Sequence, residues 1–240
     1  MFRFITLTAS AVALAACGFS SGKAEQRDAG AQTNRTYQVG AFSKIEVAGP
    51  YDLKVATGGA PSVAAKGGAA LLDETEVVVE GDTLVIRPRK KNGLRFSWRG
   101  GKANFTVSTA ALNGATIAGS GDIDVDKASG DFRGEVAGSG SLKLAALTAG
   151  AAKMSIAGSG GINAAGTANS VEVSIAGSGD VDLAGLKAKT ADISIAGSGN
   201  VSANASETAD VTIMGSGDVA ITGGAKCKSS KMGSGSVTCG

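Results

Sequence analysis

The chain has 240 residues, of which 37 are glycine, 3 are proline and none is histidine. Aromatic residues make up 4% of the chain, hydrophobic residues make up 43%, and the formal net charge is +2. This much glycine excludes a helical bundle, because each glycine inside a helix costs about 1 kcal/mol. Collagen needs far more proline and a three-residue glycine period, and a disordered chain would be less apolar and more highly charged. The composition therefore indicates an all-β protein with tight turns and a core of small aliphatic side chains.

The N-terminal residues have the layout of an export signal. Residues 1–16 carry one early positive charge, Arg3, and then an apolar run that is too short for the about 20 residues of a membrane span. The run ends in Leu14-Ala-Ala-Cys17, which is similar to the lipobox of bacterial lipoproteins, where cleavage leaves a lipid-modified cysteine. We expect a signal peptide at 1–16 and lipidation of Cys17. An ordinary signal peptide followed by a chance cysteine is the alternative.

The expected anchor also indicates a location. Residues 17–36 are rich in Ser, Gly, Ala and Gln, and we expect them to form the lipidated N-terminus and a flexible tether. Gly18 stands where an aspartate would, in the bacterial sorting rule, retain a lipoprotein at the inner membrane. We therefore expect a protein of the bacterial cell envelope, anchored by its lipid at the outer membrane, on its periplasmic or its external face.

Residues 37–113 are strand-like but irregular. Tyr51–Val55 alternates between apolar and polar residues, and Glu76–Glu80 and Thr83–Arg87 flank Gly81-Asp82 as in a β-hairpin. We expect an irregular β region that packs on the following domain or continues into it.

The most basic stretch of the chain, residues 87–102, lies inside this region. Seven of its sixteen residues are basic and none is acidic, and Phe96 and Trp98, the only tryptophan, are interleaved with them. Nucleic acid is not expected as a ligand of an exported protein, whereas an anionic glycan or lipopolysaccharide would be attracted to this charge. A solvated hairpin whose aromatic residues pack on the first coil is the alternative. The candidate binding residues are Arg89, Lys90, Lys91, Arg95, Trp98 and Arg99.

Residues 114–240 contain an internal repeat. Gly-Ser-Gly begins at positions 119, 138, 158, 177, 197, 215 and 233, and apolar residues recur two places before it and four and six places after it. A unit of about 19 residues cannot bury its own apolar face, so successive units must stack as parallel strands about 4.8 Å apart. The repeat predicts a right-handed parallel β-solenoid, since parallel crossovers have that hand.

The aspartates of the repeat could suggest a metal or an active site. Aspartate follows only three of the seven Gly-Ser-Gly motifs, never in consecutive coils, and calcium-binding β-rolls repeat every nine residues instead. A polysaccharide-active enzyme would draw on acidic and basic residues of the first coil, but no sequence feature predicts the raised pKa that a general acid needs. We expect no metal, no cofactor, no catalytic residue and no enzymatic activity. The acidic and basic residues considered are Asp122, Asp124, Asp126, Asp131, Arg133 and Lys143.

Two cysteines lie in the last repeat. Cys227 stands six residues before the last Gly-Ser-Gly and Cys239 six residues after its first glycine, both at positions that are apolar in earlier coils. We expect both side chains to point into the interior of the final coil and to form a disulfide, which an oxidising envelope favours. Two buried free thiols are the alternative.

The order of the motifs resembles a known family. Phe42–Val55, Leu71-Leu72, Asp82–Ile86 and Ala118–Asp122 together resemble the "putative auto-transporter adhesin, head GIN domain", a bacterial envelope family of unknown function, over roughly residues 38–240. The resemblance implies a glycine-rich β-helical envelope protein, often a lipoprotein, with no catalytic motif to transfer. We therefore expect a non-enzymatic, adhesin-like binding domain. The alternatives are an envelope scaffold that self-associates through the exposed strands at the ends of the solenoid and, behind it, a polysaccharide-active enzyme.

Overall fold

In a computed structural model of the protein, the chain is described over residues 25–89, 96–99 and 102–240, and its side chains over residues 28–89 and 102–240. These residues form strands almost throughout, with one five-residue helix, α1 (Ala69–Asp73). No helix in this part of the chain is long and apolar enough to cross a membrane.

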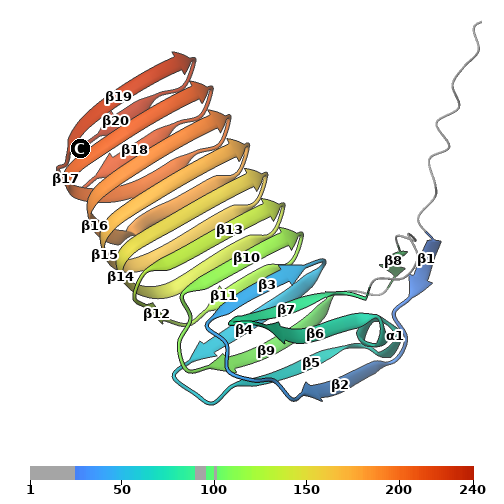
Figure 1. The fold of residues 1–240 in the computed structure, drawn as a ribbon. Helices are drawn as coiled ribbons and strands as arrows, with labels where there is room; N and C mark the ends of the chain where they lie inside the picture. Colours follow the sequence, from blue (N-terminus) through green and yellow to red (C-terminus); the bar gives the residue numbers. More distant parts are fainter. Residues whose placement is uncertain (1–24, 90–95, 100–101) are drawn as a thin grey trace, which may run out of the picture.

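The repeat region forms stacked parallel coils, which confirms the predicted β-solenoid (Figure 1). In each coil one strand leads into a Gly-Ser-Gly corner and the next strand leaves it. The strands are β10 (Gly114–Gly119), β11 (Asp122–Val125), β12 (Ala128–Ser129), β13 (Phe132–Gly138), β14 (Ser141–Gly158), β15 (Gly161–Gly177), β16 (Asp180–Gly197), β17 (Val201–Gly215), β18 (Val219–Thr222), β19 (Lys226–Gly233) and β20 (Val237–Cys239).

The register matches the columns that the repeat predicts. The column two places before the glycine is buried along the whole stack and ends at the exposed Lys231. Its members, level with one another in successive coils, are Ile117, Val136, Ile156, Ile175, Ile195, Ile213 and Lys231. Alternating residues of each strand therefore form one continuous aliphatic core.

The two glycines of each corner are required by the close approach of the coils. Gly138 has φ +131°, and a Cβ placed on it would lie 2.3 Å from the carbonyl oxygen of Gly119. A Cβ on Gly140 would lie 2.1 Å from the carbonyl oxygen of Gly121. Ser139 between them is exposed, and its backbone N–H donates to Gly119 O at 2.9 Å. The repeated motif thus serves the stacking of corners.

The solenoid continues upstream of residue 114. β3 (Lys44–Ala48) pairs in parallel with β10, and β4 (Tyr51–Thr57) pairs in parallel with β11. A further layer pairs with these two strands, because β7 (Thr83–Pro88) is parallel to β3 and β9 (Ala103–Thr109) is parallel to β4. Four strands of the irregular β region, β3, β4, β7 and β9, thus continue the parallel stacking of the solenoid.

A cap closes the end of the stack next to β7 and β9. β5 (Ser62–Gly68) pairs antiparallel with β9, β2 (Gln32–Tyr37) pairs antiparallel with β5, and β6 (Thr75–Glu80) forms the expected hairpin with β7. Buried Leu71 and Leu72 of α1 complete the core at this end. The rings of Tyr51 and Phe105 meet edge to face beneath the cap, with centroids 5.6 Å apart.

The structure corrects the expected tether over residues 17–36. β2 begins at Gln32, and Thr33 and Arg35 are half-buried, because the backbone of β2 completes the hydrogen bonding of β5. β1 (Glu25–Asp28) is a strand as well, paired in parallel with β8 (Phe96–Arg99) in a separate two-stranded sheet (Figure 1). Within the described part of this range, only the residues between β1 and β2 remain outside strands.

Candidate binding surface around the basic segment

The basic segment, residues 87–102, is an extended corner of the solenoid. Ile86 of β7 is level with Val47 of β3, and Ala103 of β9 is level with Tyr51 of β4. Two residues, Gly49 and Pro50, join β3 to β4, whereas residues 89–102 join β7 to β9. The segment is therefore an insertion on the edge where later coils carry Gly-Ser-Gly, in the layer next to the cap.

Arg87 fixes the first end of the basic segment to the cap hairpin. Its Nε lies 2.8 Å from Glu76 Oε2, and its Nη2 lies 2.6 Å from Glu80 Oε1. The hydrogen bonds to Glu80 and Glu76 raise the pKa of Arg87 above its usual value. Both glutamates belong to β6, so this guanidinium is already committed to ion pairs within the fold.

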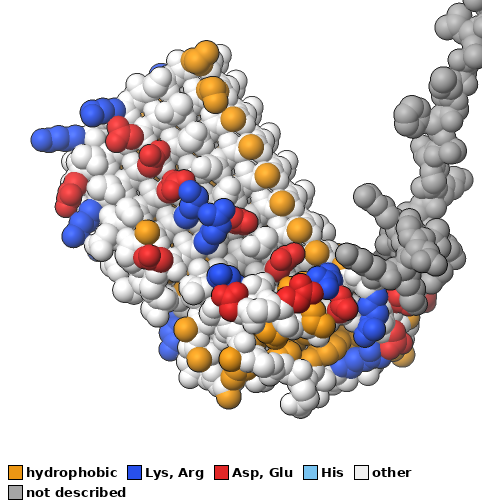
Figure 2. Space-filling view, viewed as in Figure 1, with side chains coloured by type: hydrophobic (Ala, Val, Ile, Leu, Met, Phe, Trp, Pro, Cys, Tyr) orange, Lys and Arg blue, Asp and Glu red, His pale blue; other side chains and the backbone are white. Residues whose placement is uncertain are grey.

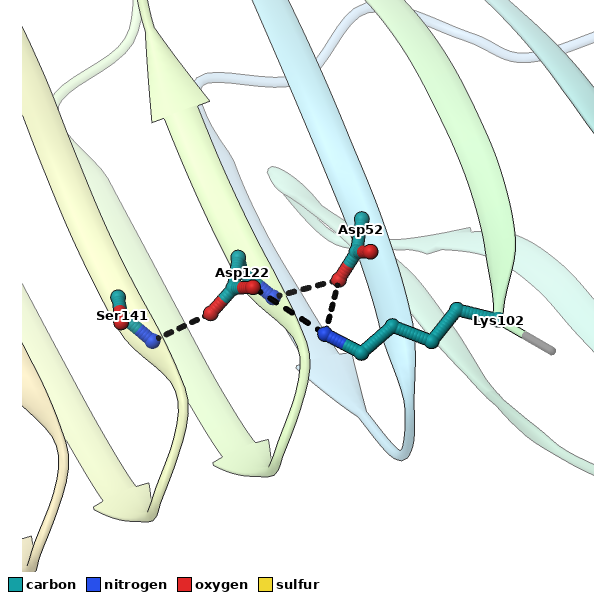
Figure 3. Close-up of polar contacts among 4 residues, drawn as sticks. All are labelled: Asp52, Lys102, Asp122 and Ser141. Carbon is teal, nitrogen blue, oxygen red and sulfur yellow. Dashed lines mark hydrogen bonds and ion pairs between the residues drawn. The ribbon is translucent and has the colours of Figure 1, made fainter.

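Lys102 fixes the other end to the solenoid. Its Nζ lies 2.9 Å from Asp52 Oδ1 and 3.2 Å from Asp122 Oδ2 (Figure 3). The hydrogen bond to Asp52, followed by that to Asp122, raises the pKa of Lys102 above its usual value. The two ends of the basic segment are thus held by ion pairs to three different strands.

The position of Asp52 corrects one expectation. The sequence places no aspartates after the corners of consecutive coils, but that comparison omits the coil of β3 and β4. With that coil included, Asp52 and Asp122 are neighbours, and Asp52 Oδ1 accepts a hydrogen bond from Asp122 N at 3.2 Å. Asp122 Oδ1 in turn accepts from Ser141 N at 2.9 Å (Figure 3). Lys102 offsets the repulsion between the two stacked carboxylates.

The six candidate binding residues lie between these fixed ends. Arg89 is exposed, and its backbone N–H donates to Glu74 O at 2.7 Å. The positions of Trp98 and Arg99 are described only as backbone of β8. Lys90, Lys91 and Arg95 lie outside the described residues.

Most acidic residues considered for catalysis accept hydrogen bonds from the backbone of a neighbouring coil. Asp126 Oδ1 accepts from Thr57 N at 3.0 Å, and Asp131 Oδ1 accepts from Ala151 N at 2.8 Å. Arg133, the basic residue considered with them, pairs with Glu135. These contacts are structural. Over the described side chains, no three histidine, cysteine or acidic residues gather in a way that could hold a metal ion.

Asp124 lies in a shallow groove near the Lys102 end of the basic segment. It is level with Lys54 on one neighbouring strand and with Lys143 on the other, so opposite charges alternate along the column. These three residues line a groove of about 400 Å³ together with Thr106, Asp126 and Ala145. The sequence pattern did not identify Lys54 as a neighbour of Asp124, because the coil that contains Lys54 lacks the Gly-Ser-Gly motif.

The corner edge also carries an apolar stripe. Figure 2 shows hydrophobic side chains running along this edge of the solenoid. The stripe consists of exposed residues directly before the corner glycine, and it ends in two methionines that are 50% and 72% exposed. Its members are Ala118, Ala137, Ala157, Ala176, Ala196, Met214 and Met232. The basic segment thus begins where this stripe reaches the cap.

The cysteines fall in two different parts of the chain. Cys17 lies outside the described residues. Cys227 and Cys239 are joined by a disulfide, with Cα atoms 6.6 Å apart. Cys227 is half-buried against the core, as the column position predicts, but Cys239 is exposed, because no coil lies beyond the last one in the described structure.

Known structures share this architecture. A putative adhesin from Bacteroides fragilis has a TM-score of 0.80 at 23% identity, covering 88% of this chain and 99% of that one. A protein from Parabacteroides distasonis, described as a putative lipid binding protein, has a TM-score of 0.73 at 26% identity, covering 90% and 100%. A putative adhesin from the same organism has a TM-score of 0.71 at 20% identity, with the same coverage. Comparison with curated proteins found no relative.

The sequence also matches a family directly. The family described as "Putative auto-transporter adhesin, head GIN domain" matches residues 41–225, which include the β3–β4 coil, the basic segment and nearly all of the repeats. The match extends over more than half of the chain, and the protein therefore belongs to this head GIN domain family.

Proposed function

We propose that the protein is a lipid-anchored envelope protein whose basic segment binds an anionic envelope ligand, a lipopolysaccharide or an acidic glycan. The observation that carries the proposal is the extension of a two-residue corner into fourteen residues on a rigid scaffold. Loops held on a rigid scaffold commonly carry binding residues. Arg87 and Lys102 fix its ends, and the residues between them include five basic side chains and no acidic one.

The anchor and the location rest on the sequence and the family. The Leu14-Ala-Ala-Cys17 motif supports lipidation of Cys17. Gly18, in place of an aspartate, supports a location at the outer membrane rather than retention at the inner membrane. The names of the family and of the Bacteroides structure support an adhesin-like role in the envelope. The name of the Parabacteroides relative, a putative lipid binding protein, supports a ligand with lipid character.

We propose a binding role rather than an enzymatic one. The carboxylates of Asp122, Asp126 and Asp131 accept backbone hydrogen bonds that hold coils together, and this use supports a structural role for them. A scaffold assembled through the solenoid ends has less support. The cap closes one end of the solenoid. The last coil at the other end carries Lys226, Lys228 and Lys231. Lysines on an edge strand oppose pairing with another chain.

Co-sedimentation with lipopolysaccharide, and in parallel with an acidic and a neutral glycan, tests the proposal. We expect binding that weakens as salt is raised from low to physiological concentration, because exposed charge contacts are screened. A Lys90→Ala/Lys91→Ala/Arg95→Ala variant should lose most of the binding. A matched control, Lys187→Ala/Lys189→Ala/Lys228→Ala, removes three exposed lysines elsewhere on the solenoid and should bind like the wild type. Equal loss in both variants, or no binding at low salt, would contradict the proposal.

A further inference from the structure

The groove that contains Asp124 crosses four adjacent strands. Thr106 of β9, Lys54 of β4, Asp124 of β11 and Lys143 of β14 are level with one another, so they form one column across the groove. All four residues are exposed. Since neighbouring strands lie about 4.8 Å apart, the two lysines stand about 10 Å apart along the stack, with the carboxylate between them.

Short side chains leave the hollow beside this column. Ala56 and Ala145, both exposed, stand two residues after the two lysines and line the groove. Asp126 has the corresponding position after Asp124, but its Oδ1 accepts a hydrogen bond from Thr57 N at 3.0 Å and is committed to the fold. The groove of about 400 Å³ therefore offers apolar surface beside a row of charges.

The three charges of the column have no partner within the described fold. Lys102 and Lys153, elsewhere on the solenoid, each contact a carboxylate. Within the described part of the chain, by contrast, no ion pair or hydrogen bond reaches the side chain of Lys54, Asp124 or Lys143. A carboxylate only accepts hydrogen bonds. A ligand that satisfies all three groups must therefore present a donor between two anionic groups.

We propose that the groove binds a short stretch of an acidic glycan that carries a carboxylate on every second sugar. The two carboxylates contact Lys54 and Lys143, and hydroxyl groups of the sugar between them donate to Asp124. The apolar C–H face of that sugar packs on Ala56 and Ala145, as apolar surface lines most ligand sites. A pyranose unit is about as long as the spacing between strands, so the glycan runs along the stack.

This site is distinct from the basic segment in residues and in chemistry. None of its residues belongs to the basic segment, so the inference goes beyond the proposed function. With Asp126 included, the groove carries two ammonium groups and two carboxylates. Its net charge is thus zero, and the spacing of the charges, rather than their sum, selects the ligand.

A hyaluronan tetrasaccharide is the probe, because its two carboxylates lie on alternate sugars. N-acetylchitotetraose, a neutral tetrasaccharide of the same length, is the control ligand. The full-length protein is kept in solution by a non-ionic detergent and carries Lys90→Ala/Lys91→Ala/Arg95→Ala in every sample, which removes most of the charge of the basic segment. Equilibrium dialysis at low salt measures the dissociation constants. We expect saturable binding of the acidic tetrasaccharide and none of the neutral one.

Further substitutions in this background locate the site. Lys54→Ala/Lys143→Ala should weaken binding severalfold. Lys66→Ala/Lys228→Ala, the matched control, removes two exposed lysines from the cap and the last coil and should bind like its parent. Asp124→Lys/Lys143→Asp keeps the total charge but makes the two cations neighbours, so it should also weaken binding severalfold. Thermal unfolding confirms that each variant is folded.

Failure of this inference is distinguishable from failure of the proposed function. Three results would each overturn the inference: equal binding by the two double-alanine variants, equal binding by the charge swap and its parent, or equal binding of the two tetrasaccharides. The absence of any tetrasaccharide binding at low salt would overturn it as well. The proposed function rests instead on co-sedimentation with lipopolysaccharide or an acidic glycan and on its loss when the basic segment is neutralised.

Discussion

Asp52 and Asp122 are 70 residues apart in sequence, yet the side chain of the first accepts a hydrogen bond from the backbone N–H of the second at 3.2 Å. Two carboxylates therefore stand in adjacent coils at the same position of the corner. Lys102, the last residue of the basic segment, contacts both of them. The end of the basic segment at Lys102 and the stacking of the first coils are thus linked through one ammonium group.

Replacing Lys102 by alanine should lower the free energy of unfolding, because the two carboxylates would face each other without a cation. The contacts are partly exposed and screened, so the expected loss is at most about 1 kcal/mol. Asp52→Asn keeps the acceptor for Asp122 N–H and removes one charge, so it should recover part of the loss. Urea unfolding of the four proteins in a double-mutant cycle measures the coupling. A coupling energy of zero would contradict the shared contact.

Asp218 should contribute to stability in acid solution. Hydrogen bonds from the Ser236 hydroxyl, and then from its backbone N–H, lower the pKa of Asp218 below its usual 3.8. The stabilisation is therefore complete above about pH 4 and is lost as the pH falls through the lower folded-state pKa. Asp218→Asn keeps an acceptor oxygen, as Asn200 does naturally when it accepts from Asp218 N. The variant should show a shallower loss of stability in acid than the wild type, and identical acid titrations would refute the assignment.

The corner glycines should tolerate no side chain. Gly177 has φ +135°, and a Cβ there would lie 2.2 Å from Gly158 O, while a Cβ on Gly179 would lie 2.5 Å from Gly160 O. Gly177→Ala should destabilise the protein by more than the roughly 1–2 kcal/mol that a left-handed backbone conformation costs alone, because the Cβ also clashes with a backbone oxygen. Gly179→Ala has only the clash and should cost roughly 1–3 kcal/mol. Ser178→Ala, between them, is the matched control and should change stability little. Thermal unfolding of the three variants would expose an error if the serine variant were the least stable.

The disulfide between Cys227 and Cys239 should stabilise the last coil. It closes a loop with a sequence separation of 12, for which the chain-entropy relation gives about 3 kcal/mol. In Cys227→Ser/Cys239→Ser, amide hydrogens of β19 and β20 should exchange faster, while those of β13 to β16 keep their protection. The intact wild type should be two hydrogen masses lighter before reduction than after it. Two free thiols in the unreduced protein would contradict the bond.

Lys231 should keep the last coil from pairing with another molecule. It occupies the column of Ile213, where every preceding coil has a buried aliphatic residue, and it is exposed. Lys231→Ile should raise the tendency to self-associate, because it removes an edge charge and extends an apolar column. Size-exclusion chromatography with light scattering measures the effect, and Lys228→Ala, on the same strand but outside this column, is the control. A monomeric Lys231→Ile variant at high concentration would show that this lysine has no such role.

The Gly-Ser-Gly repeat could be predicted residue by residue, because stacking requires apolar residues at the same positions, and the same pair of corner glycines, in successive coils. Ile175 and its neighbours were assigned correctly for this reason. The coil of β3 and β4 escaped detection because its corner is Gly49-Pro50, without the serine, and because residues 83–109 stack beneath it out of chain order. The pattern of β2, Gln-Thr-Asn-Arg-Thr-Tyr, has almost no apolar residue, so backbone pairing with β5 places it in the fold.

The part played by Lys102 could not be read from the sequence for a related reason. Its two partners, Asp52 and Asp122, come together only because the β3–β4 coil lies between the β7–β9 layer and β10. The charge of the basic segment is visible in the sequence. Which of its cations are already used within the fold depends on this non-sequential stacking.

Because the middle coils share one register, the number of coils in the solenoid can change without altering its two ends. From β13 to β17, each Gly-Ser-Gly corner lies directly over the previous one, and the cap and the disulfide lie at opposite ends. Removing or duplicating one unit, such as residues 158–176, joins equivalent positions and leaves both ends intact. Each unit changes the height of the stack by about 4.8 Å. Evolution can therefore set how far the last coil stands from the cap, in steps of one strand spacing, without altering the chemistry at either end.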